Sequence, residues 1–186
     1  MKLSIRALAL PEVKLVSAGR MSDRRGYFAE TYVRRDFAAA RIPQEFVQDN
    51  QSLSHAPGTV RGLHFQMRPF AQAKLVRVLH GSIFDVCVDL RRSSPRYGRH
   101  VAVELAADGG DQLFVPAGFA HGFCTLEPET AVLYKVDALY SAEHERGVDW
   151  SDPALAIPWP VAKGKAILSE KDSALPRLQD LPVCFD

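Results

Sequence analysis

KLVRVLHGSIFDVCVDL, residues 74–90, carries the clearest strand pattern in the chain. Its β-branched and apolar residues predict two strands joined at the turn His80-Gly81. Alternation divides the side chains of the second strand between two faces. One face is apolar, with Phe84, Val86, Val88 and Leu90, and the other is mixed, with Ile83, Asp85, Cys87 and Asp89. Such a pair of faces is typical of a closed or layered sheet, and barrels of this kind also hold ligand cavities.

The flanking sequence extends the same pattern. Residues 101–105, 112–115 and 131–136 predict three more short strands, separated by glycine and proline. A short helix is predicted at 34–41, and a helical turn near 169–172. From about residue 150 the chain is rich in proline and predicts an irregular tail that wraps the body. The sequence thus predicts one all-β domain, residues 1–186, built as a β-sandwich or barrel with a few short helices.

Charge and composition exclude several classes of protein. A formal net charge of +1 gives no overall positive field of the kind that nucleic-acid-binding proteins use. No run approaches the roughly 20 apolar residues of a membrane span, and Arg6 and Pro11 interrupt the N-terminal run, which argues against a signal peptide. The three cysteines lie far apart and indicate neither a disulfide framework nor a zinc site. We therefore expect a soluble cytoplasmic protein without a nucleic-acid or membrane partner.

The segment 46–74, FVQDNQSLSHAPGTVRGLHFQMRPFAQAK, gathers amide, guanidinium, imidazole and ammonium groups. Arginine suits bidentate contacts to phosphate, and lysine supplies a point charge. His64 lies between Leu63 and Phe65, so it is either a core histidine or a general base. Strict alternation puts Arg61 and His64 on opposite faces, and both reach one pocket only if the strand bends or bulges near Gly62. The polar candidates of this segment are Gln48, Asn50, Arg61, His64, Gln66 and Lys74.

Two later residues also have two interpretations each. Tyr134 alternates with two valines on an apolar face, so it either packs there or delivers a proton inside a cavity. Asp172 follows Ser169 by three residues, so it either belongs to a capping box or charges and orients a histidine. His121 stands alone, and histidines scattered singly predict no metal site. The chain has no dinucleotide fingerprint, and we expect no cofactor.

Seven segments in the same order resemble the dTDP-4-dehydrorhamnose 3,5-epimerase family. The resemblance covers nearly the whole chain, from about residue 11 to residue 178. They are DRRGYFAETY (23–32), QDNQS (48–52), RGLHFQ (61–66), AQAKLVRVLHGSIFDVCVDLR (71–91), QLFVPAGFAHGF (112–123), LYKVDALYSAEHERG (133–147) and SEKD (169–172). The chain departs from the family pattern at Gln51, where histidine is frequent, and at Phe65, where tyrosine is frequent.

The resemblance implies a cupin-type jelly roll without a metal, which works as a homodimer on a nucleotide-diphosphate sugar. It implies that His64 is the base and Asp172 its partner. It also implies that Tyr134 is the acid on the opposite face of the sugar and that Lys74 stabilises the enolate oxygen. The positions that resemble substrate-binding or further active-site residues are Arg25, Glu30, Gln48, Asn50, Arg61, His121 and Tyr140, with residues 25–30 contributed by the neighbouring subunit.

The activity that the resemblance implies is epimerisation at C3 and C5 of dTDP-4-dehydro-6-deoxy-D-glucose through enolate intermediates. The product is dTDP-4-dehydro-L-rhamnose. A base on one face of the sugar and an acid on the other invert each centre in turn, since the C4 ketone acidifies both neighbouring protons. The sequence leaves two alternatives open: an epimerase of one centre only, and a non-catalytic cupin that binds a sugar nucleotide.

Overall fold

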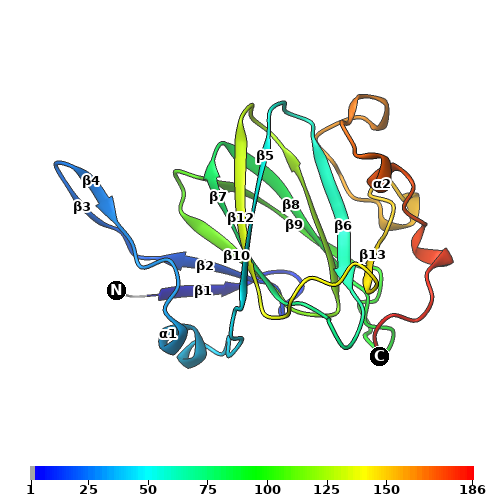
Figure 1. Ribbon diagram of the computed structural model, residues 1–186, viewed down its shortest axis with the longest axis horizontal. Coiled ribbons are helices and arrows are strands. Elements are labelled where there is room, and N and C mark those ends of the chain that lie inside the picture. The colour runs from blue at the N-terminus through cyan, green and yellow to red at the C-terminus, as the bar shows by residue number, and fades with distance from the viewer. Residues whose placement is uncertain (1–2) are drawn as a thin grey trace.

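The computed structural model describes residues 3–186, so the first two residues of the predicted domain lie outside it. Its body is a sandwich of two antiparallel sheets (Figure 1). The six-stranded sheet contains, in spatial order, β1 Leu3–Ala7, β2 Lys14–Ala18, β10 Asp111–Val115, β7 Lys74–His80, β12 Thr130–Val136 and β5 Gln48–Ser54. The five-stranded sheet contains β13 Glu145–Gly147, β6 Val60–Gln66, β11 Phe119–Thr125, β8 Ser82–Asp89 and β9 His100–Ala106.

Between β5 and β13 the chain passes repeatedly from one sheet to the other, which is the connectivity of a jelly roll. The main core lies between the sheets, where Val76 and Val132 of one sheet pack with Ile83 and Phe123 of the other. The all-β prediction is therefore confirmed, and the fold is a cupin-type jelly roll.

Most of the predicted elements are present, with ends shifted by one or two residues. The two strands of the opening segment are β7 and β8, and Gly81 between them has φ +75°. A Cβ atom there would lie 2.4 Å from the Thr130 hydroxyl oxygen. Both the backbone conformation of this turn and the space beside it therefore require glycine. The helix predicted at 34–41 is α1 Arg34–Ala39, and the turn predicted at 169–172 is α2 Glu170–Ser173. The three other predicted strands are β9, β10 and β12.

The two faces of β8 serve different layers. Ile83 and Cys87, on the mixed face, lie in the core between the sheets. Val86 and Val88, on the apolar face, pack outside the sandwich against residues that include Phe185 near the C-terminus. Residues 150–186 form this outer layer with the 3-10 turns η1 Pro153–Leu155, η2 Lys163–Lys165 and η3 Leu178–Asp180 (Figure 1). Because the tail covers an otherwise apolar sheet face, its burial stabilises the five-stranded sheet.

A short hairpin extends away from the body at the end opposite the tail (Figure 1). It consists of β3 Met21–Asp23 and β4 Gly26–Phe28. Its apolar side chains face solvent in the single chain, with Met21, Tyr27 and Phe28 exposed by 55%, 59% and 60%. An exposed apolar arm of this kind is typical of a protein that contacts a partner.

The remaining structural observations concern cysteines, metals and membranes. Cys87 and Cys124 are buried and Cys184 is partly buried, and all three are free thiols, as the spacing predicted. Within residues 3–186 no three His, Cys, Asp or Glu side chains converge as metal ligands. No helix in the described part of the chain is long and apolar enough to cross a membrane.

Candidate active site

A cavity of 440 Å³ opens between the two sheets. It draws side chains from β6, β7, β11 and β12 and from the α2 turn. Six residues predicted to belong to the site line this cavity: Arg61, His64, Lys74, His121, Tyr134 and Asp172. These residues are separated by up to 111 positions in the sequence, so only the fold brings them together.

A bulge in β6 allows two of these residues to share the cavity. His64 pairs with His121 and Arg61 pairs with Phe123, so three steps along β6 match two along β11. Gly62 lies within the bulge with φ +124°, and a Cβ atom there would lie 2.6 Å from the Cα of Gly122. The predicted irregularity near Gly62 is therefore confirmed, and a glycine facing a glycine is what makes it possible.

His64 and Asp172 form a close pair. His64 Nε2 lies 2.5 Å from Asp172 Oδ1, and the carboxyl side chain is only 6% exposed. Burial alone would raise the pKa of Asp172, but hydrogen bonds from His64, Ser169 and the Gly62 backbone, with the His64 charge, lower it overall. Asp172 is therefore a carboxylate at neutral pH. Ser169 Oγ also accepts the backbone N–H of Asp172, so Ser169 caps α2 while the Asp172 carboxylate contacts the histidine.

A second histidine is bound by a carboxylate deeper in the cavity wall. His121 Nε2 lies 2.9 Å from both oxygens of Asp85, which is fully buried. The sequence did not single out Asp85, although its place on the mixed face of β8 was the available signal. Lys74 Nζ lies 3.3 Å from the His64 carbonyl oxygen. Burial lowers the pKa of Lys74 to about 8, against the carboxylates of Asp85 and Glu145, which raise it.

Tyr134 belongs to the other sheet. Its side chain packs against the main core and also lines the cavity, and its hydroxyl has no hydrogen-bond partner among residues 3–186. Burial raises the pKa of Tyr134, the Glu145 charge raises it further, and Arg61 opposes both. Tyr134 is thus neutral at physiological pH and available as a proton donor. His64 and Tyr134 come from facing sheets, so they approach the cavity from opposite walls.

A smaller cavity of 90 Å³ continues from the first, sharing His64, Lys74 and Tyr134. Gln48, Asn50 and Tyr140 line it. Gln48 donates to Asn50 Oδ1 over 2.8 Å and accepts the backbone N–H of Tyr140 over 3.1 Å. The Tyr140 side chain is exposed by 55%, which leaves its ring face open for stacking.

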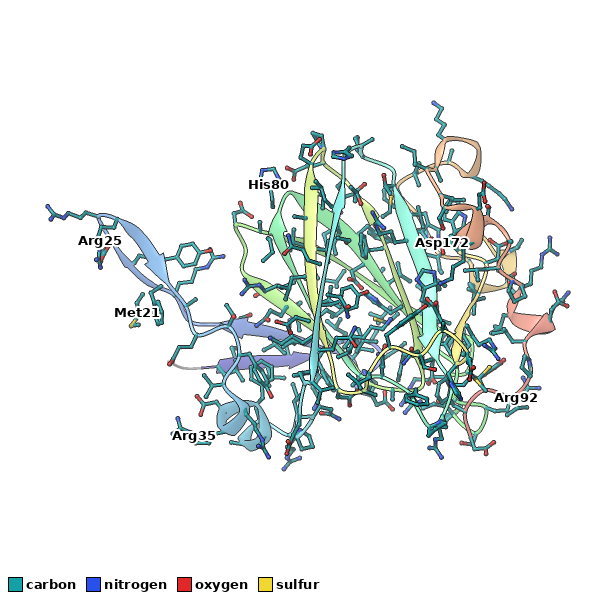
Figure 2. The ribbon with its side chains drawn as sticks, viewed as in Figure 1. Met21, Arg25, Arg35, His80, Arg92 and Asp172 are labelled. Carbon is teal, nitrogen blue, oxygen red and sulfur yellow. The ribbon has the colours of Figure 1, made fainter. Side chains whose placement is uncertain are left out.

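Arg25 and Glu30 are not brought to this cavity by their own chain. Arg25 lies at the tip of the hairpin, where it pairs with Asp23 over 2.6 Å. Figure 2 shows Arg25 and Asp172 on opposite sides of the molecule. Glu30 follows the hairpin and lines a different, very small pocket. Any role for these two residues in substrate binding requires a second copy of the chain, as the resemblance implied.

A jelly roll whose cavity holds a carboxylate-bound histidine, a lysine and a neutral tyrosine is a cupin-type enzyme of proton transfer. The family model for dTDP-4-dehydrorhamnose 3,5-epimerase matches residues 7–180. The chain belongs to this family.

Individual relatives agree with the family match. The chain is 52% identical over 184 residues to the dTDP-4-dehydrorhamnose 3,5-epimerase of Sinorhizobium fredii, covering 99% of this chain and 94% of that protein. The crystal structure of the Bacillus anthracis enzyme with TDP and pyrophosphate bound has a TM-score of 0.92 and 48% identity, covering 95% and 99% of the two chains. The Legionella pneumophila enzyme in complex with dTDP-4-keto-L-rhamnose gives a TM-score of 0.93 at 37% identity, with 97% and 95% covered.

Proposed function

We propose that this chain epimerises C3 and C5 of dTDP-4-dehydro-6-deoxy-D-glucose to give dTDP-4-dehydro-L-rhamnose, a step of dTDP-L-rhamnose biosynthesis. The observation that carries the proposal is that His64 and Tyr134 line one cavity from facing sheets, and that Lys74 of β7 lines the same cavity. A base and an acid on opposite faces of a sugar are what inversion of a carbon centre requires.

The chemistry starts at the base. Nε2 of His64 donates to Asp172, so Nδ1 carries the lone pair that accepts a proton from C3 or C5. Breaking that C–H bond leaves an enolate whose negative charge develops on the C4 oxygen. The Lys74 ammonium stabilises this charge, and such electrostatic stabilisation is commonly the largest contribution to the rate. Tyr134 then donates its proton to the carbon from the opposite face, and the centre is inverted.

The nucleotide end of the substrate occupies the smaller cavity. Gln48 and Asn50 present amide groups there, and Tyr140 offers an aromatic face for the base. Arg61, which donates to Ser54 Oγ and to the Leu53 carbonyl oxygen, is held at the edge of the larger cavity where it faces the diphosphate. His121, fixed by Asp85, borders the sugar. The cytoplasmic location and the organisation as one domain stay predictions.

Exchange of deuterium from the solvent into the substrate tests this function. Incubation with dTDP-4-dehydro-6-deoxy-D-glucose in D₂O is expected to place deuterium at both C3 and C5, followed by mass and by loss of proton signals. A reaction without enzyme corrects for spontaneous exchange. Exchange at a single centre would replace the proposal by a monofunctional epimerase. No exchange above the control, with the protein folded, would overturn it in favour of a binding protein.

Activity is expected to fall as the pH rises through about 8, because Lys74 has a pKa of about 8 in the folded protein. Below that pH the ammonium is present and stabilises the enolate, and above it the neutral amine cannot. The pH dependence of kcat/KM measures this alkaline limb. Arginine stays charged at this pH, so a folded and active Lys74→Arg variant should not show the fall in kcat/KM above pH 8. A rate that keeps rising well above pH 8 would contradict a role for the lysine charge.

The active form is proposed to be a homodimer. Leu53 and Leu79, on the outer face of the six-stranded sheet, are exposed by 47% and 36%, and the apolar hairpin projects from the same sheet. A second copy packed on this face would bury these side chains and bring residues 25–30 to the cavity of its neighbour. One interface would thereby explain both the exposed apolar surface and the distance of Arg25 and Glu30 from their own cavity.

Mixing two inactive variants tests the shared site. Arg25→Ala and His64→Ala each spoil every site of their own homodimer. After the two proteins are combined and exchange subunits, half of the dimers contain one chain of each variant. Each of these heterodimers has one site with both substitutions and one site with neither. About a quarter of the wild-type activity is therefore expected. Sites built from one chain would leave the mixture no more active than its components.

A further inference from the structure

We propose that Asp152 is a positioning residue of this site: its buried carboxylate anchors the chain that leaves α2 and thereby holds Asp172 against His64. The inference deepens the proposed function and rests on it for the roles of His64 and Asp172. Asp152 lies outside the seven segments that resemble the family, and it lines neither cavity. It therefore acts through Asp172 and does not touch the sugar.

α2 cannot hold its own place. It has only four residues, Glu170–Ser173, and helices that short are not stable by their own hydrogen bonds. It lies against β6 (Figure 1), so the chain on each side of it decides where it sits. Before α2, Ile167 donates to the Gly58 carbonyl oxygen and accepts the backbone N–H of Val60, which attaches that side to the start of β6. After α2, residues 174–178 are held by three separate contacts.

The first of these contacts ties α2 to the strand pair that carries His64. The Leu175 side chain packs directly on Gly147, where an added Cβ atom would lie 2.7 Å from both of its terminal carbons. Gly147 in turn lies opposite His64 in the pairing of β13 with β6. The chain that leaves α2 therefore rests on the neighbour of the histidine that Asp172 must reach.

The other two contacts reach the loop that follows β13. The Pro176 carbonyl oxygen accepts the backbone N–H of Asp149 over 2.7 Å. The backbone N–H of Leu178 donates to Asp152 Oδ2 over 2.8 Å. Of the three contacts, the one to Asp152 is the only one made by a polar side chain, so a substitution can remove this hydrogen bond by itself.

The Asp152 carboxylate serves two backbone donors at once. It is only 5% exposed, and its other oxygen, Oδ1, accepts the N–H of Ala154 over 3.0 Å as the N-cap of η1. A cap uses a single acceptor, which serine or asparagine supplies without the cost of burying a carboxylate. The second acceptor is what the anchoring of Leu178 requires.

Small movements of α2 matter because His64 Nε2 and Asp172 Oδ1 are 2.5 Å apart. A displacement on the order of 1 Å takes such a pair to the limit of a hydrogen bond. A misplacement of that size can lower the rate of an enzyme by about 100-fold. The groups that line the smaller cavity lie on other elements, so loss of the anchor should slow the chemical step and leave substrate binding nearly unchanged.

Asp152→Asn removes the anchor and keeps the cap. The asparagine carbonyl oxygen still caps η1, but the amide nitrogen cannot accept the Leu178 N–H. We expect kcat to fall by about tenfold and KM to change by less than about twofold. Asp149→Ala is the matched control in the same loop. It removes the side-chain bonds to Ser151 but leaves the backbone bond to Pro176, so its kcat should equal that of the wild type.

A second pair of variants removes the donor instead of the acceptor. Leu178 is the first residue of η3 and follows Arg177, whose φ of −73° and ψ of 160° are compatible with a following proline. Leu178→Pro deletes the N–H, Leu178→Ala keeps it, and both lose the leucine side chain. Leu178→Pro should therefore lower kcat as Asp152→Asn does, and Leu178→Ala should not. If Asp152→Asn does not fold, this pair decides the question.

Two further readouts separate positioning from a general loss of structure. In a protein that already carries Asp172→Ala, Asp152→Asn should lower kcat no further, because the carboxylate that it positions is gone. The second readout needs no substrate. The downfield proton NMR signal of His64 Nε2–H, assigned by its absence in Asp172→Ala, should be lost in Asp152→Asn and retained in Asp149→Ala.

Either of two results would overturn the inference. One is an equal loss of kcat from Asp152→Asn with and without the Asp172 carboxylate, and the other is an unchanged His64 signal in Asp152→Asn. Each would reduce Asp152 to the cap of η1. A wild-type protein that exchanges no sugar proton would instead overturn the proposed function, and the NMR signal would still decide whether Asp152 holds the pair together.

Discussion

His64→Ala is expected to lower the rate of exchange at both C3 and C5 by about 10³-fold or more, since general base catalysis alone contributes 10² to 10⁴. The variant also leaves Asp172, which is 6% exposed and ionised, without the partner that lies 2.5 Å away. A carboxylate in that place repels the enolate that must form nearby. The loss should therefore exceed that of a missing base, and it should appear in kcat more than in KM.

A matched control is available in His55. Its ring is exposed to solvent and contacts Glu129, and it lines neither of the two cavities. His55→Ala should exchange both protons at the wild-type rate. The base assignment fails if His64→Ala retains turnover while circular dichroism shows the fold intact, or if the two alanine variants lose activity equally.

Tyr134→Phe provides the contrast. The base remains, so removal of a proton from the sugar continues, but the donor on the opposite wall is lost. Deuterium is expected to enter the substrate from the His64 side while inverted product is strongly reduced. This split between exchange and inversion would distinguish an acid from a binding residue, whose loss would raise KM and reduce both processes together.

The sequence was informative where side-chain alternation coincides with burial. β7, β8 and β12 carry β-branched residues that only a strand accommodates well, so their predictions hold within one or two residues. β11 was not among the predicted strands, although it is buried along its whole length. Gly122 lacks a side chain because β6 approaches its backbone closely. Gly62 on β6 is 60 positions away in the chain, so the sequence around Gly122 carries no sign of this requirement.

The same limit explains which site residues were missed. Asp85 and Glu145 are carboxylates in strands, and a carboxylate in a single sequence is most simply interpreted as a solvated surface group. Their burial depends on His121 and Lys171, which lie 36 and 26 residues away in the chain. Arg25 and Glu30 show the opposite case, because the resemblance assigned them to a site that their own chain does not form.

Gly62→Ala is expected to be the most destabilising single change in the site, by about 3 to 5 kcal/mol, which is a large part of the 5 to 15 kcal/mol that stabilises a typical domain. An added Cβ would lie 2.6 Å from the Cα of Gly122 and 2.8 Å from the carbonyl oxygen of His121, and neither backbone atom can move without disturbing β11. The φ of +124° adds backbone strain for any residue with a side chain. Urea denaturation measures the free energy of unfolding.

Two other glycines separate these contributions. Gly26 has φ +128° and nothing within 4 Å of an added Cβ, so Gly26→Ala reports strain alone and should lose about 1 to 2 kcal/mol. Gly122→Ala has no positive φ but places a Cβ 2.7 Å from the Arg61 carbonyl oxygen, so it reports the collision alone. If Gly62→Ala loses no more free energy of unfolding than Gly26→Ala, the close approach of β6 and β11 is not the reason that glycine is needed at the bulge. Gly62→Ala and Gly122→Ala are both expected to lose stability, and a variant that still folds is expected to lose exchange activity as well. That result would show that the chemistry depends on the bulge that directs Arg61 and His64 into one cavity.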